Sequence, residues 1–294
     1  MPELPETEAY VAALGAHVVG QALETTRLAS PFLLRTVEPP LDEAHGKTLE
    51  SASRLGKRIL MHFCDGPTLV IHPMISGRLR WKKRGAGLPG KAGLLAFDFV
   101  QGTLVLTEQG SKKRASLHAF ADPESALVLD PGGLEVIGCD PGEFEGRLRA
   151  SGHTLKRALT SPKIFSGIGN AWSDEILWEA RLSPAARAGT LKPEKVEALF
   201  QATQSVLTAA RDRLVERALQ AFPDKVTAFQ PEMAVHGRFQ EPCPRCESPI
   251  QRITRAAGHD FHYCAECQTG GRILADRSLS RLLKDSWPKR LEDL

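Results

Sequence analysis

The chain begins Met1-Pro-Glu-Leu-Pro-Glu-Thr-Glu8. Pro5 suits the first turn of an α-helix, and Glu6 suits the positive end of the helix dipole. The apolar residues that follow recur at helical spacing as far as Gly20 (Val11, Leu14, Val18). The sequence therefore predicts an N-terminal helix whose first turn is rich in carboxylates.

The same stretch also has a chemical interpretation. Pro2 is a small residue directly after Met1, so removal of Met1 would leave a secondary amine at the N-terminus. An α-amino group titrates near ~7.7–8.0, so a useful fraction is neutral and nucleophilic at neutral pH. Such an amine attacks a sugar anomeric carbon and gives an iminium ion, with Glu3 and Glu6 placed to donate a proton and to stabilise charge. On residue types alone, an ordinary capped helix remains the simpler interpretation.

A basic segment interrupts a chain that is otherwise close to neutral. The formal net charge is +3, yet nine basic residues and only two acidic ones lie between Ile75 and Ala115; the basic residues are Arg78, Arg80, Lys82, Lys83, Arg84, Lys91, Lys112, Lys113 and Arg114. One basic segment on a near-neutral protein indicates a face that binds a polyanion. A solvated loop explains the same charges equally well.

Four of the six cysteines form two C-x2-C pairs, Cys243 with Cys246 and Cys264 with Cys267, separated by 17 residues. This spacing is typical of a structural zinc site in which four thiolates form a tetrahedron. Disulfides are the alternative, but a chain that stays in the cytoplasm disfavours them. We therefore expect one structural Zn²⁺. The two remaining cysteines are isolated and are expected to be core residues.

The segment from Leu55 to Cys64 alternates in a way that predicts a β-strand. Lys57 is the single polar residue on the apolar face of that strand. A lysine there either extends its amine outward or is held in a cleft with a lowered pKa. Outward extension is the simpler interpretation for an isolated lysine, whereas a cleft lysine fits a site that also contains a reactive amine and acids.

Length and composition indicate a globular protein with more than one domain. The chain has 294 residues, of which 42% are hydrophobic and 25% are charged. No apolar run approaches the ~20 residues of a membrane span, and no signal-peptide pattern opens the chain. We expect a multidomain α+β protein that stays in the cytoplasm.

Strand patterns separated by turns continue to about Leu129, and they include a hairpin from Leu94 to Thr107. Helices do not alternate with these strands, so we expect an antiparallel β-sandwich or flattened barrel with one flanking helix. Asp130-Pro-Gly-Gly133 marks a boundary. The expected domains are residues 1–130 (the sandwich), 131–232 (a helical domain) and 233–294 (a cysteine hairpin and tail).

A glycine-rich turn, Phe165-Ser-Gly-Ile-Gly-Asn170, lies between two helices of the central domain. Its glycines let the backbone expose N–H groups at the start of the following helix, where a phosphate is stabilised. Asn170 adds a side-chain donor, and Lys156 from the preceding helix is placed to reach the same phosphate. An ordinary corner between two helices is the alternative.

Together these motifs resemble the formamidopyrimidine-DNA glycosylase / endonuclease VIII family, and the resemblance covers nearly the whole chain. Four motifs occur in the order of the family: the Pro2–Glu6 start, Arg54-Leu-Gly-Lys57-Arg58, Gly167-Ile-Gly-Asn170 followed by Asp174-Glu175, and the cysteine hairpin. The Leu-Pro-Glu start is closer to the formamidopyrimidine branch. The resemblance implies a helix-two-turn-helix domain in the centre and a zinc-finger hairpin at the end.

The resemblance implies a bifunctional DNA glycosylase and AP lyase of base excision repair. Pro2 would displace an oxidised base through a Schiff base, Glu3 would assist proton transfer, and β- and δ-elimination would cleave the strand. Glu6 and Lys57 complete the implied catalytic set. The implied partner is double-stranded DNA with damaged bases or abasic sites, bound by a monomer at the nucleoid and away from membranes; the implied contacts are Met74, Ile75, Arg114, Lys156, Asn170 and His259.

The sequence departs from the family at the expected DNA contacts. His259 stands five residues before the third zinc cysteine, where the family usually presents an arginine, and Arg255 and Arg272 are candidates to replace it. No Arg-Phe wedge is present; the segment Gln109–Arg114 stands roughly in its place, with Met74 or Ile75 as the other wedge residue.

Two lengths also differ from the family. The loop between Phe222 and His236 is short, and the tail after Cys267 is long. In the formamidopyrimidine branch a longer loop covers 8-oxoguanine, so an oxidised-pyrimidine glycosylase of the endonuclease VIII type is an alternative. A zinc-containing protein that binds damaged DNA without turnover is a second alternative.

Overall fold

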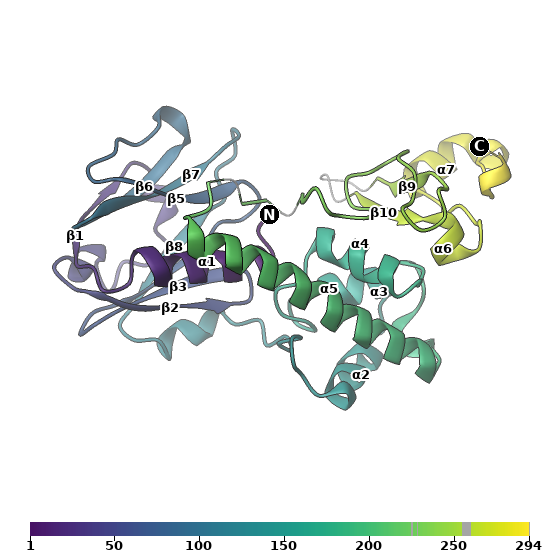
Figure 1. The fold of residues 1–294 in the computed structure, drawn as a ribbon, viewed down its shortest axis with the longest axis horizontal. Helices are drawn as coiled ribbons and strands as arrows, with labels where there is room; N and C mark the ends of the chain where they lie inside the picture. The colour runs from purple at the N-terminus through teal and green to yellow at the C-terminus, as the bar shows by residue number, and fades with distance from the viewer. Residues whose placement is uncertain (225, 228, 255–259, 294) are drawn as a thin grey trace. The chain divides into compact units, whose positions relative to one another are not determined.

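The structure is a computed structural model that describes residues 1–224, 226–227, 229–254 and 260–293. Two compact units make up the chain. The first comprises Met1–Pro131 and Ala209–Ala228, and the second comprises Gly132–Thr208 and Phe229–Leu294. The ribbon of the whole chain is drawn in Figure 1. The expected division into three domains stays a prediction.

The first unit contains two four-stranded sheets, and every strand pair in them is antiparallel. One sheet has the order β1-β6-β7-β5, with strands Leu23–Leu28, Gly93–Phe99, Gly102–Glu108 and Gly77–Lys83. The other has the order β2-β3-β4-β8, with strands Leu49–Leu55, Arg58–Phe63, Thr68–His72 and Ser116–Phe120. The predicted antiparallel sandwich is confirmed.

One apolar core joins these sheets to the first helix, α1 (Leu4–His17). Alternate residues of the strands contribute to this core, since successive side chains of a strand point to opposite faces. The helix adds Tyr10 and Leu14, which are fully buried in the same cluster. The Tyr10 hydroxyl also accepts the backbone N–H of Leu79 in β5 at 3.1 Å. The predicted N-terminal helix is therefore fixed to the sheets through its apolar face.

Lys57 does not lie on a strand face, and this part of the sequence-based prediction is wrong. The segment from Leu55 to Cys64 is not one strand, because β2 ends at Leu55 and β3 starts at Arg58. Gly56 has a φ of 61°, a left-handed conformation that glycine adopts without strain and that allows a tight turn. Lys57 therefore occupies the tip of a hairpin.

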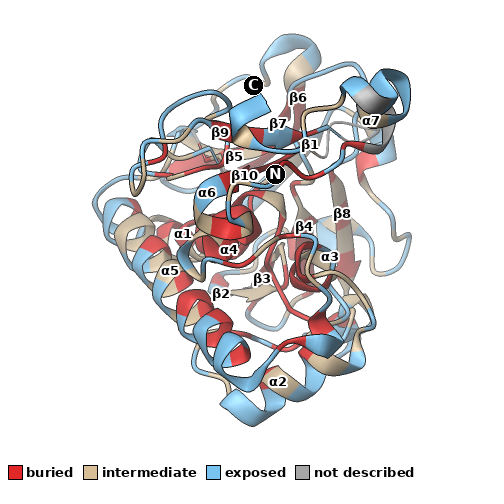
Figure 2. Cartoon of the chain, turned by 90° about the vertical axis from the view of Figure 1, so that its right-hand side faces the viewer, coloured by how far each residue is buried: buried red, intermediate tan, exposed pale blue. Residues whose placement is uncertain are grey.

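The second unit contains helices and the cysteine hairpin. Its helices are α2 (Pro141–Ala150), α3 (Leu155–Thr160) and α4 (Asn170–Glu179), and α5 (Pro193–Gln220) belongs to this unit as far as Thr208. The hairpin has strands β9 (Ile250–Ile253) and β10 (Phe261–Cys264), and the helices α6 (Ala265–Thr269) and α7 (Arg277–Leu283) follow it. Most of α4 is buried, as Figure 2 shows.

Short 3-10 helices occur in both units: Pro31–Leu33, Leu41–Ala44, Gly90–Ala92, Ser125–Leu129, Ala188–Thr190, Lys284–Ser286 and Leu291–Asp293. The glycine-rich turn lies between α3 and α4, as the sequence predicts. Among the described residues, no helix has both the length and the apolar character that crossing a bilayer requires.

Gly102 tests how tightly the first unit is packed. A Cβ atom at Gly102 would lie 2.4 Å from Cζ2 of Trp81, so we expect Gly102→Ala to lower the free energy of unfolding by about 1–3 kcal/mol through overpacking. Chemical denaturation measures this. The matched control is Gly87→Ala, since nothing lies within 4 Å of its Cβ. Equal stability of the two variants would contradict the packing described here.

Candidate functional site

The first turn of α1 holds two buried carboxylates directly after the N-terminus. Glu3 is the N-cap residue, and Glu6 at the third helical position accepts the backbone N–H of Glu3 at 2.9 Å. The two residues form a reciprocal capping box, which satisfies backbone N–H groups that the helix itself leaves unpaired. Both side chains are buried. Glu3 and Glu6 therefore cap the helix, and the predicted catalytic role falls on the same two residues.

Charged groups of both signs act on the amine at the N-terminus. Burial lowers the pKa of this amine, and the positive charges of Arg78 and Lys57 lower it further. The carboxylates of Glu3 and Glu6 oppose that effect. This amine belongs to Met1, the residue directly before Pro2. The structure thus brings together Glu3, Glu6 and Lys57 around the chain terminus.

An ion pair ties the hairpin that carries Lys57 to helix α1. Nε of Arg54 donates to Oε1 of Glu8 at 2.7 Å, and Nη1 of Arg54 donates to the carbonyl of Gly56 at 2.9 Å. Glu8 lies in α1 and Gly56 directly precedes Lys57, so one guanidinium links the helix to the hairpin tip. From the sequence, Glu8 is expected only to suit the positive end of the helix dipole, and its ion pair with Arg54 is not predicted.

The turn from β4 to β5 presents one of the two wedge candidates to solvent. Ile75 is 49% exposed. Met74 has a φ of 54°, and its N–H donates to Nδ1 of His72 at 3.0 Å. Burial, together with the charges of Arg58 and Lys57, lowers the pKa of His72 to about 4, so its imidazole is a neutral acceptor at neutral pH.

Gly77 ends this turn, and its N–H donates to the carbonyl of Pro73 at 2.8 Å. A Cβ at Gly77 would lie 2.1 Å from that oxygen, so the close approach requires glycine. The conformation that exposes Ile75 is therefore set by the backbone on both sides of it.

The basic loop Gln109–Arg114 lies against the Ile75 turn. The hydroxyl of Ser76 donates to the carbonyl of Gln109 at 2.8 Å. Glu108 is buried, and its Oε2 accepts the N–H groups of Arg114 at 2.8 Å and Ala115 at 3.0 Å. The Arg114 side chain is exposed. The turn that carries Ile75 and the loop that carries Arg114 are therefore neighbours in the first unit.

In the second unit, Lys156 and Asn170 are joined to each other rather than left open to solvent. The Lys156 ammonium is buried; it donates to the carbonyl of Asn170, to the hydroxyl of Ser173 at 2.8 Å and to Oδ1 of Asp174. The Asn170 amide donates to the carbonyl of Asp260 at the start of β10. These contacts fix the glycine-rich turn to the hairpin, and direct phosphate binding by either side chain stays a prediction.

Asp174 is the centre of a buried polar cluster. Its Oδ2 accepts Nδ1 of His236 at 2.7 Å and the backbone N–H of His262 at 3.0 Å. Although burial opposes ionisation, Lys156 and the two histidines hold the pKa of Asp174 far below its usual range. Asp174, His236 and His262 place ligand-type atoms within 4.8 Å of one another. Because the Lys156 ammonium already neutralises this carboxylate, we interpret the cluster as an ion-pair network and not as a metal site.

Glu175, the neighbour of Asp174 in α4, binds a backbone segment. Its carboxylate accepts the N–H groups of Ala234 at 2.7 Å, Val235 at 3.0 Å and His236 at 2.8 Å. Burial raises the pKa of Glu175, and these three hydrogen bonds oppose that shift. Both acids had been noted in the sequence only as part of a motif. The structure shows that they attach α4 to the segment that leads into the cysteine knuckles.

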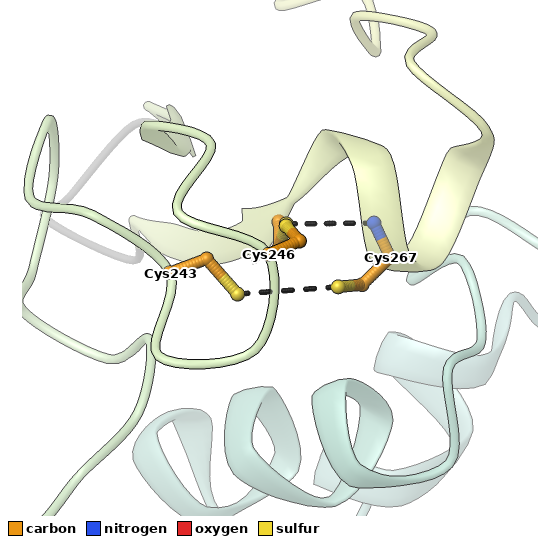
Figure 3. A group of neighbouring side chains, drawn as sticks. Cys243, Cys246 and Cys267 are labelled. Atoms are coloured by element: carbon orange, nitrogen blue, oxygen red, sulfur yellow. Dashed lines mark hydrogen bonds between the residues drawn. The ribbon is translucent and has the colours of Figure 1, made fainter.

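The four cysteines of the hairpin converge, and their sulfur atoms lie within 4.8 Å of one another. Sγ of Cys243 is 3.9 Å from Sγ of Cys267, as Figure 3 shows, and Sγ of Cys246 is 3.4 Å from Sγ of Cys264. None of them forms a disulfide. Trp178 of α4 donates its indole N–H to Cys243 at 3.4 Å, which suits a thiolate. This donor set fits a tetrahedral metal site for an ion such as Zn²⁺.

The remaining predicted residue is His259, which lies outside the described residues together with Arg255. The described site residues form groups within their own units. The first unit holds Pro2, Glu3, Glu6, Lys57, Met74, Ile75 and Arg114, and the second holds Lys156, Asn170 and the four cysteines. The roles assigned to them stay predictions.

Family models match most of this chain. The formamidopyrimidine-DNA glycosylase N-terminal domain matches residues 1–117, and the formamidopyrimidine-DNA glycosylase H2TH domain matches residues 138–216. The formamidopyrimidine-DNA glycosylase of Carboxydothermus hydrogenoformans is 30% identical over 276 residues, which cover 91% of this chain and 100% of that protein. That of Mesorhizobium japonicum is 31% identical over 298 residues and covers 92% of this chain and 100% of its own.

Solved structures agree with the sequence matches. The Lactococcus lactis Fpg in complex with DNA containing an abasic site superimposes with a TM-score of 0.79 at 26% identity, covering 91% of this chain and 99% of that chain. MutM in complex with DNA containing carbocyclic 8-oxo-G has a TM-score of 0.79 at 26% identity, with 91% of this chain and 100% of that chain covered.

The link between Glu8 and Arg54 is testable as a double-mutant cycle. We expect Glu8→Gln and Arg54→Gln to show a coupling energy of about 1 kcal/mol in the free energy of unfolding, because the pair is largely shielded from solvent. The exposed pair of Glu24 and Arg84 is the matched control and should show coupling near zero. Equal coupling in both pairs would contradict the proposed link.

Proposed function

Because the chain belongs to the formamidopyrimidine-DNA glycosylase family, we propose that it removes oxidised bases from double-stranded DNA and cleaves the strand at the abasic site. The observation that supports this best is the position of Glu3 and Glu6, which are buried in the first turn of α1 next to Pro2, with the charges of Lys57 and Arg78 acting on the same chain terminus. Relatives solved with abasic, 8-oxo-G and Fapy-dG DNA support oxidised purines as the first substrates to test.

We propose that the nucleophile is Pro2 after removal of Met1. Its nitrogen lone pair attacks C1′ of the damaged nucleotide, and the N-glycosidic bond breaks with its electron pair going to the base. The leaving base takes up a proton, and Glu3 assists proton transfer at the sugar so that the ring opens to an iminium ion. Glu6 holds the first turn of α1 in shape through its bond to the N–H of Glu3.

The iminium ion then acts as an electron sink for strand cleavage. It acidifies the C2′ proton; loss of that proton expels the 3′ phosphate in a β-elimination, and a second elimination expels the 5′ phosphate. Hydrolysis of the imine frees the amine and releases the sugar fragment. We propose that Lys57, at its hairpin tip, contacts the lesion nucleotide or its phosphate during these steps.

DNA binding in this proposal involves both units. The base must leave the stack to reach Pro2, which costs a few kcal/mol and costs less for damaged bases. Ile75 and the Arg114 loop are candidates to fill the vacated space, and the turn at Asn170, fixed by Lys156, is a candidate phosphate site. His259 remains a proposed contact of the hairpin. We propose that the protein acts as a single chain on DNA in the cytoplasm.

We propose that the four cysteines bind one structural Zn²⁺. A closed set of four thiolates leaves no position for substrate, so the ion would fold the hairpin and take no part in chemistry. The residues of this chain that support the set are Trp178, which donates to Cys243, and Cys267, whose N–H donates to Sγ of Cys264 at 3.4 Å.

Borohydride trapping tests the catalytic proposal. The enzyme is incubated with duplexes that carry 8-oxoguanine, formamidopyrimidine, thymine glycol or an abasic site, and borohydride reduces the imine to a stable covalent complex. We expect trapping with the purine lesions and the abasic site, weaker trapping by Pro2→Gly, and base release about 10²-fold slower in Glu3→Gln. Glu24→Gln, an exposed carboxylate in the first unit, is the control that should leave trapping unchanged.

The same panel separates the alternatives. Trapping with thymine glycol but not with purine lesions would show that the substrates are oxidised pyrimidines. Tight binding to abasic DNA with no trapped adduct on any duplex would show a binding protein without turnover. Retained Met1, seen by mass spectrometry, would exclude Pro2 as the nucleophile.

Metal analysis tests the zinc proposal. We expect one zinc per chain by atomic emission spectroscopy, and Cys264→Ser should lose the metal and lower the melting temperature, because structural zinc contributes directly to folding. Cys64→Ser is the matched control, since Cys64 stands apart from the cluster and is exposed; the prediction that Cys64 is a core residue is wrong. A metal-free wild-type protein with normal stability would refute this site.

A further inference from the structure

The C-terminal tail packs on the apolar side of the cysteine hairpin. Ile273 and Leu274 join Ile253, Phe261 and Tyr263 in one buried cluster, and Trp287 and Leu291 pack against it. The backbone N–H of Leu274 also donates to the Tyr263 hydroxyl at 2.7 Å. The tail is therefore fixed to the hairpin by an apolar core and by hydrogen bonds.

Two stretches of this tail pair with each other around Arg272 and Arg290. The N–H of Ile273 donates to the carbonyl of Lys289 at 2.8 Å, and the N–H of Leu291 donates to the carbonyl of Gly271 at 2.9 Å. These bonds flank an antiparallel bridge between Arg272 and Arg290. In such a non-hydrogen-bonded pair the two side chains lie on the same face and close together.

The two arginines form a like-charge pair on the surface. Both side chains are exposed, and within the described part of the chain neither forms a salt bridge with a carboxylate. Like charges directly opposite each other destabilise a pair of strands. The nearby Asp293 carboxylate accepts the backbone N–H groups of Lys289 and Arg290 at 2.8 Å each, so it caps the turn. These hydrogen bonds, and the charges of Arg290 and Lys289, lower the pKa of Asp293, so this acid offsets part of the repulsion. An external anion bound by both arginines would offset more of it.

More positive charge lies in the same tail. Its exposed basic side chains, among those described, are Arg272, Arg281, Lys284, Lys289 and Arg290. Guanidinium groups bind phosphate through two parallel hydrogen bonds, so a pair of arginines is able to contact a phosphodiester. The relatives named above are matched over 99–100% of their length by 91–92% of this chain, so part of this chain has no counterpart in them.

We propose that Arg272 and Arg290 bind a backbone phosphate of duplex DNA, as an addition to the contacts of the hairpin on which the tail is packed. The site takes a phosphodiester and reads no base, so it adds affinity without sequence preference. This inference rests on the proposed function only for the identity of the polyanion. Because the tail is packed on the hairpin, binding requires no ordering of a disordered segment.

The salt dependence of binding tests the proposal. Dissociation constants for a duplex with an abasic-site analogue are measured by fluorescence anisotropy over a range of NaCl concentrations. The slope of log K against log salt should become shallower by about 0.9 in the double variant Arg272→Gln/Arg290→Gln, the change expected for one lost phosphate contact. The charge-keeping double variant Arg272→Lys/Arg290→Lys should retain the wild-type slope.

Lys192→Gln/Lys195→Gln is the matched control, because it removes the same charge from exposed lysines at the start of α5. Its slope should equal that of wild type; an equal loss in both double variants would overturn the proposal. An unchanged slope in the arginine variant would also overturn it, and a lower melting temperature in that case would show a structural role for the pair. Failure of the proposed function is distinguishable, since it would appear as absent borohydride trapping by the wild type.

Discussion

Two adjacent carboxylates inside the second unit, Asp174 and Glu175, are the constraint on which that unit depends. A buried carboxylate is costly unless it is paired and hydrogen-bonded. Asp174 pairs with the Lys156 ammonium and accepts a hydrogen bond from His236, and Glu175 accepts three consecutive backbone N–H groups. Removing Asp174 would leave donors unsatisfied on α3 and on β10. Removing Glu175 would leave the backbone N–H groups of residues 234–236 unsatisfied. These contacts therefore join the glycine-rich turn to the cysteine hairpin.

The first unit orders the beginning of the chain, although chain ends are poorly ordered in most proteins unless they are tied down. The capping box of Glu3 and Glu6 starts the helix at the terminus, Tyr10 anchors that helix to β5, and Arg54 links it to the turn before Lys57. Each of these contacts is a hydrogen bond or an ion pair, and the apolar core of the first unit adds to them. Order at the terminus is thus a property of the fold.

Much of this arrangement can be predicted from sequence where the signal is local. The antiparallel sandwich, the N-terminal helix and the cysteine hairpin follow from periodicity and spacing. The position of Lys57 was wrong because an alternating pattern runs unbroken through a two-residue turn that only the left-handed φ of Gly56 reveals. The roles of Glu8 and Glu175 were beyond reach, because their partners are 46 and 59–61 residues away in the chain.

The indole of Trp178 connects the cysteine cluster to the same helix that carries Asp174 and Glu175. Oxidation of thiolates by peroxide removes them as metal ligands. Oxidation of the cluster would therefore affect α4 as well as the hairpin, and with α4 the glycine-rich turn at the N-terminus of that helix. The oxidative stress that creates the lesions would thus act on the repair protein as well, and cellular reductants would help to set how much of it remains active.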